Sequence, residues 1–110
     1  MVTSKPLFEA LQAAAADTVQ YTAPVNTKTI VDKFTGTNTT GAAATLTVFI
    51  TVAAAGVASN TILSAKSIAP GECYTCPEVV GHVLAAGDRI QTASGTANAI
   101  TIRASGREIT

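Results

Sequence analysis

The sequence Thr45-Leu46-Thr47-Val48-Phe49-Ile50-Thr51-Val52 decides the predicted fold. Aliphatic side chains alternate in it with threonines and one phenylalanine, and alternating side chains lie on opposite faces of a β-strand. Most of its residues are β-branched, which suits a pleated surface. The stretch therefore predicts the central strand of an antiparallel sheet. Its aliphatic face, which packs against a second sheet, carries Leu46, Val48, Ile50 and Val52.

Shorter β-patterns lie on both sides of this strand and are separated by turn signals. They cover residues 19–23, 27–37, 61–68, 73–76, 89–93 and 99–103. We expect strand 27–37 to pair with strand 43–52 as a hairpin through the turn at residues 38–41. Residues 18–110 thus predict an all-β fold, a single antiparallel β-sandwich or jelly roll of about seven or eight short strands.

Asp32 breaks the alternation of strand 27–37, because it falls on the same face as Ile30 and Phe34. Either this position lies at a sheet edge or a β-bulge shifts the register. The sequence leaves both explanations open.

Residues 1–17 predict an N-terminal helix or docking arm. Ser4 can cap a helix, Pro6 is tolerated in a first turn, and Leu7, Phe8 and Leu11 form an apolar stripe over residues 6–16. Such a helix packs either on its own sandwich or on a neighbouring subunit. Glu9 and Gln12 interrupt the apolar run, which favours a mature product over a secretory signal.

The composition points to one weakly charged domain. The chain has 110 residues, of which 47% are hydrophobic and 13% charged, and seven basic residues balance seven acidic ones. We therefore expect no nucleic-acid partner, and the lack of a long apolar run predicts no membrane span. A surface with so little charge favours coverage by protein partners.

The residues that could carry chemistry do not form a catalytic or metal-binding pattern. Cys73 and Cys76 are spaced C-x-x-C, but Pro77 follows them where a redox motif needs a helix. A structural zinc site needs four ligands, and the two cysteines with the single histidine, His82, do not complete such a set. We expect no enzyme, no catalytic residues, no cofactor and no metal. A disulfide or an intersubunit bridge stays open for the thiols.

The outward position of Phe49 among threonines makes it either part of a second packing layer or an aromatic anchor for another chain. Tyr21 is a weaker candidate of the same kind. Together with the apolar stripe of the N-terminal segment, the predicted partner interface comprises Leu7, Phe8, Leu11, Phe49 and Tyr21.

Several turn and strand-start motifs resemble those of small β-sandwich structural proteins of tailed bacteriophages. They are TAPVNTKTI (22–30), NTTGAAATLTV (38–48), IAPGE (68–72), LAAGDRIQ (84–91) and IRASGREIT (102–110). The resemblance implies a virion protein, made in the host cytoplasm and located on the capsid surface. It implies a capsid decoration or cement protein that binds across major capsid protein subunits. Self-association as a dimer or trimer is expected as well.

Two other functions remain open. Within the virion, the chain could be a tail, neck or fibre component. It could also be a ligand-binding sandwich for carbohydrate or host recognition. The absence of Trp and the presence of only two Tyr argue against a sugar-binding platform.

Overall fold

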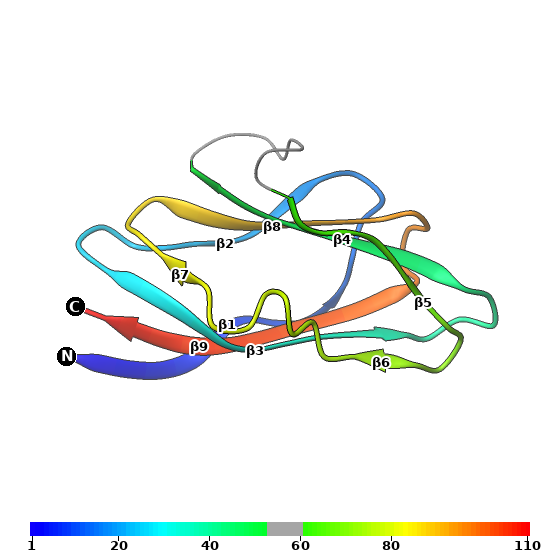
Figure 1. The fold of residues 1–110 in the computed structure, drawn as a ribbon, viewed down its shortest axis with the longest axis horizontal. Coiled ribbons are helices and arrows are strands. Elements are labelled where there is room, and N and C mark those ends of the chain that lie inside the picture. Colours follow the sequence, from blue (N-terminus) through cyan, green and yellow to red (C-terminus); the bar gives the residue numbers. More distant parts are fainter. Residues whose placement is uncertain (53–60) are drawn as a thin grey trace.

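Two antiparallel sheets pack face to face in the computed structural model, which describes residues 1–52 and 61–110 (Figure 1). The described residues form nine strands. Sheet A has the order β1 (Val2–Gln12), β9 (Ile100–Ile109), β3 (Lys28–Asn38) and β6 (Cys73–Tyr74), and β7 (Val83–Leu84) also pairs with β3. Sheet B has the order β2 (Thr18–Thr22), β8 (Asp88–Ser94), β4 (Ala44–Val52) and β5 (Thr61–Ile68).

The chain changes sheet at most of its connections, so neighbouring strands come from distant parts of the sequence. The pairing of β1 with β9 brings Val2 opposite Ile109, and both chain ends lie at the same end of the sandwich (Figure 1). The predicted hairpin of strands 27–37 and 43–52 is wrong: β3 pairs with β9, β6 and β7, whereas β4 pairs with β8 and β5. The strands β3 and β4 lie in different sheets, and their buried apolar side chains belong to the same core.

Asn38 shapes the crossover from β3 to β4. Its side chain is fully buried, and its Nδ2 donates hydrogen bonds to the carbonyl oxygens of Ala42 (2.8 Å) and Ile68 (2.9 Å). Its Oδ1 accepts hydrogen bonds from the backbone N (2.9 Å) and Oγ1 (2.8 Å) of Thr40. A buried amide with donors and acceptor bonded in this way fixes the path of the chain between the sheets.

The aliphatic face of the central strand packs in the core, as predicted. Leu46 and Val48 are fully buried, and Ile50 packs against the core at its margin. Val52 ends β4, and its side chain lies outside the described part of the structure. Other fully buried side chains come from both sheets: Val31, Phe34, Leu84, Ile90, Ile100 and Ile102.

A β-bulge explains the position of Asp32. The register between β3 and β9 shifts between Val31 and Lys33, while Val31 and Phe34 both point into the core. Asp32 and Lys33 are therefore consecutive and both exposed on the outer face of sheet A. Of the two explanations that the sequence left open, the bulge is the correct one.

The N-terminal segment is a strand, and the predicted helix over residues 6–16 is wrong. Leu7 and Phe8 are only 7% and 8% exposed, and the ring of Phe8 meets that of Phe34 edge to face at 5.8 Å. The register with β9 shifts between Pro6 and Phe8 and again between Phe8 and Leu11. These shifts turn three unevenly spaced apolar residues to one face of a strand, which imitates a helical stripe in the sequence. Among the described residues, no helix has the length and apolarity of a membrane span.

Candidate docking surface

The residues predicted as a partner interface do not gather on one exposed surface. Leu7, Phe8 and Tyr21 belong to the buried core, and Leu11 packs against it. Phe49 is half-buried on the outer face of sheet B, where it lies opposite Gln91 of β8 and Thr61 of β5. Phe49 is thus the one member of the set that is both outward and partly accessible.

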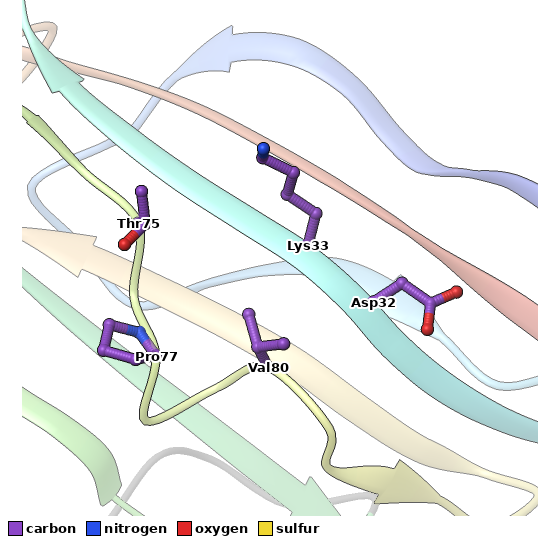
Figure 2. A pocket seen from close by; sticks show the side chains of 5 residues that line it. All are labelled: Asp32, Lys33, Thr75, Pro77 and Val80. Atoms are coloured by element: carbon purple, nitrogen blue, oxygen red, sulfur yellow. The ribbon is translucent and has the colours of Figure 1, made fainter.

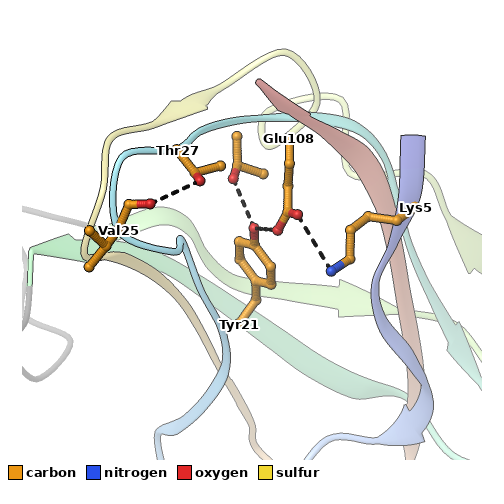
Figure 3. A network of polar contacts seen from close by, with 6 residues as sticks. Lys5, Tyr21, Val25, Thr27 and Glu108 are labelled. Atoms are coloured by element: carbon orange, nitrogen blue, oxygen red, sulfur yellow. Dashed lines mark hydrogen bonds and ion pairs between the residues drawn. The ribbon is translucent and has the colours of Figure 1, made fainter. Parts of the chain in front are cut away.

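Tyr21 joins the two sheets through a polar network (Figure 3). Its hydroxyl lies 2.8 Å from Oγ1 of Thr29 and donates a hydrogen bond to Oε2 of Glu108, while Nζ of Lys5 lies 3.5 Å from Oε1 of the same carboxylate. Burial, reinforced by the hydrogen bond to Glu108, raises the pKa of Tyr21 to about 12. The network therefore connects β2 of sheet B to three strands of sheet A and has a structural role.

Replacing Tyr21 by Phe should destabilise the fold by about 1–2 kcal/mol at neutral pH, because the buried partners of the hydroxyl lose a hydrogen bond. The native pKa of Tyr21 lies above the ordinary value of 10.0, so its contribution is present below pH 10 and is lost as the pH rises through about 12. Urea unfolding at pH 7 and pH 11 measures both effects.

Tyr74→Phe is the matched control, because the hydroxyl of Tyr74 donates to Glu78 at the exposed surface (2.6 Å). It should cost less stability than Tyr21→Phe. Equal losses for the two variants would contradict a structural role for the buried network.

The two thiols and the histidine belong to no metal-binding cluster in the part of the chain that the structure describes. Cys73 is exposed and Cys76 is buried, and both are free. Burial raises the pKa of the Cys76 thiol to about 12, which keeps it protonated and unreactive at neutral pH. His82 is exposed, and its backbone carbonyl accepts a hydrogen bond from the backbone N of Val31 (3.1 Å). The described residues contain no group of three or more His, Cys, Asp or Glu that could hold a metal.

Two shallow hollows indent the surface of sheet A. The first has a volume of about 330 Å³ and lies between the bulge of β3 and the segment that joins β6 to β7; Figure 2 shows its lining residues, Asp32, Lys33, Thr75, Pro77 and Val80. The second, of about 420 Å³, lies near the chain ends and is lined by Asn26, Thr27, Lys28, Ala85, Ala86, Ile109 and Thr110. Each hollow combines an apolar lining with one lysine, Lys33 in the first and Lys28 in the second.

Most of the basic side chains of the protein lie on the outer face of sheet A. Four of the seven basic side chains are exposed there, on the adjacent strands β3 and β9: Lys28, Lys33, Arg103 and Arg107. We call these four residues the cationic row. Sequence reasoning missed it because the residues are far apart in the chain and net charge is zero. The available signal was the alternation of apolar or small residues with polar ones from Ile100 to Arg107, in which two of the polar residues are Arg103 and Arg107.

The long edge strands are poor templates for pairing with another chain. β1 carries Lys5, Pro6 and two register shifts, and β5 carries Lys66 together with Ala65 at a φ of 44° and shifts of its own. Charges, proline and bulges at an edge discourage the addition of a further strand. The broad outer faces of the sheets are therefore better candidates for docking than the edges.

Comparison with protein-family models, with curated proteins and with solved structures finds no match to this chain. The described residues form an all-β, two-sheet sandwich.

Proposed function

We propose that the protein is a structural component of a bacteriophage virion, and specifically a capsid decoration or cement protein. The observation that carries the proposal is the strand order. The chain crosses between the sheets at most of its connections, so that β1-β9-β3-β6 faces β2-β8-β4-β5. This arrangement matches the jelly roll, an architecture of viral capsid domains and also of lectins and cupins.

The motifs that resemble phage sandwich proteins meet in space, which supports the proposal further. Asn38 begins the motif at residues 38–48, and it contacts the motif at residues 68–72 through three hydrogen bonds. Its side chain donates to the carbonyl of Ile68 (2.9 Å), its backbone N donates to the carbonyl of Glu72 (3.0 Å), and its carbonyl accepts from the backbone N of Gly71 (2.9 Å). These contacts give the two motifs a structural role, because they hold the crossover after β3 against the turn after β5.

A cement protein works by binding alone. Copies that bind the assembled shell across its subunit joints, but not the free subunits, stabilise the shell by mass action. A ligand present at about 100 times its dissociation constant adds about 2.7 kcal/mol per site. Symmetric self-association as a dimer or trimer belongs to the same proposal, since closed symmetry is usual in such assemblies.

Thermal release of the genome from purified virus heads tests the proposal. Heads of the source virus that carry the protein should withstand a higher temperature than heads stripped of it, and adding the purified protein back should restore the difference. Equal release temperatures, or binding to isolated tails but not to heads, would reject a cementing role. The second outcome would favour the tail, neck or fibre alternative.

A further inference from the structure

We propose that the outer face of sheet A is the docking face and that its partner is an acidic protein surface. This inference rests on the proposed function and adds the chemistry of the contact. Its core is the cationic row of Lys28, Lys33, Arg103 and Arg107 on the adjacent strands β3 and β9.

The register of β3 and β9 arranges these charges regularly. Arg107 lies opposite Ile30 and Arg103 lies opposite Thr35, so the cations fall beside positions 28, 30, 33 and 35 of β3. At about 3.3 Å per residue, neighbouring charges are roughly 7–10 Å apart and the row is about 20 Å long. The bulge is necessary for this arrangement, because it places Lys33 on the outer face when simple alternation would not.

The row keeps a net positive charge after its local partners are counted. Asp32 is the one carboxylate among the outward residues of β3 and β9, and Arg107 binds it with three hydrogen bonds of 3.0–3.2 Å. Glu108, the other acidic residue on these strands, points inward to Tyr21 and Lys5. Glu9 is exposed at the β1 edge of the sheet. Lys28, Lys33 and Arg103 therefore present positive charge to a partner.

The surroundings of the row fit a protein better than a nucleic acid. No outward position of β3 or β9 is aromatic, whereas sheets that bind single-stranded nucleic acid stack bases on aromatic side chains. Threonine and serine lie between the cations, and the partly accessible Ile30 and exposed Val83 pair beside them. Arginine is enriched at protein interfaces, and the row contains two arginines.

The hollow of about 330 Å³ beside Lys33 strengthens the case for a protein partner. Pro77 and Val80 give it an apolar wall, while Lys33 and Asp32 line its side next to the row (Figure 2). A side chain of the partner can enter it, and anchor side chains that fill pockets carry much of the binding energy at protein interfaces.

The test compares two double variants that remove the same charge. Lys33→Gln with Arg103→Gln changes the row, and Lys66→Gln with Arg89→Gln changes basic residues of sheet B. Binding of each to stripped heads of the source virus is measured by co-sedimentation at low and physiological salt, and thermal melting checks the fold. The row variant should bind roughly tenfold more weakly, and the sheet B variant should bind as the wild type does. Wild-type binding should weaken as salt rises.

Three results would overturn the inference: equal binding of the row variant and the wild type, equal weakening of both double variants, or insensitivity to salt. Soluble poly-L-glutamate is a second probe that does not require heads; it should compete with them and should bind the wild type more strongly than the row variant. Stronger retention of duplex DNA or of phosphatidylserine vesicles than of poly-L-glutamate would also overturn it, in favour of those partners. If the wild type binds poly-L-glutamate through the row but does not bind heads, the proposed function fails while the acidic specificity of the face holds.

Discussion

A chain that lacks residues 1–16 is expected not to fold. The deletion removes β1, and with it Leu7, Phe8 and the fully buried Ala13 from the core. Burial of each large apolar side chain contributes about 1.5–3 kcal/mol, and the loss of several approaches the whole stability of a typical domain. The deletion also leaves β9, with Ile100 and Ile102, as a bare edge of sheet A. Circular dichroism with urea titration should show no cooperative unfolding transition.

A point variant makes the same test when the deletion yields insoluble protein. Phe8→Ala should cost about 3–5 kcal/mol, because it opens a cavity beside Phe34. Glu9→Ala, one residue further along the same strand but exposed, should stay within about 0.5 kcal/mol of the wild type. If Phe8→Ala is as stable as the wild type, the N-terminal segment is an arm that contacts only a neighbour.

Gly106→Ala should have the second-largest effect, a loss of about 3 kcal/mol or more. A Cβ at this position would collide with the backbone carbonyl oxygen of Ile30 and would lie 3.1 Å from Cδ1 of Leu7. The backbone of a central strand cannot move away without breaking the pairing of β9 with β3. The missing Cβ also provides the space into which the bulge of β1 turns Leu7. Equilibrium urea unfolding measures the change.

Two other glycines serve as graded controls for Gly106→Ala. A Cβ at Gly36 would lie 2.9 Å from Cδ2 of Leu46, a side-chain atom that can shift, so Gly36→Ala should cost less. A Cβ at Gly41 would meet nothing within 4 Å, and Gly41→Ala should be neutral or slightly stabilising. A Gly106→Ala variant as stable as Gly41→Ala would contradict the close approach of β9 to β3.

The sequence was most informative where one face of a strand is buried. The alternation of Leu46 and Val48 with threonines located β4. The irregularity at Asp32 left a sheet edge and a bulge open, and the register shift between Val31 and Lys33 shows that it is a bulge. Period-two patterns arise from a local property, the direction of successive side chains, so they can be read along the chain.

Pairing and bulges were harder to predict because they depend on residues distant in sequence. The sequence of β1 resembles a helical stripe because two bulges disguise its alternation, and the space that accepts Leu7 is provided by Gly106. The partner of β3 is β9, about seventy residues later, and not the adjacent β4. The cationic row was missed for the same reason, since only the register brings Lys33 near Arg103.

Electron cryo-microscopy of the source virion tests the central claim most directly, namely that this sandwich acts by docking on a viral shell. The account predicts density for the protein at many symmetry-related positions on the capsid, with the outer face of sheet A turned toward the shell and Lys33 and Arg103 near carboxylates of the major capsid protein. Density confined to a few copies at one vertex or on the tail, or a shell contact made by sheet B with the cationic row facing solvent, would contradict it.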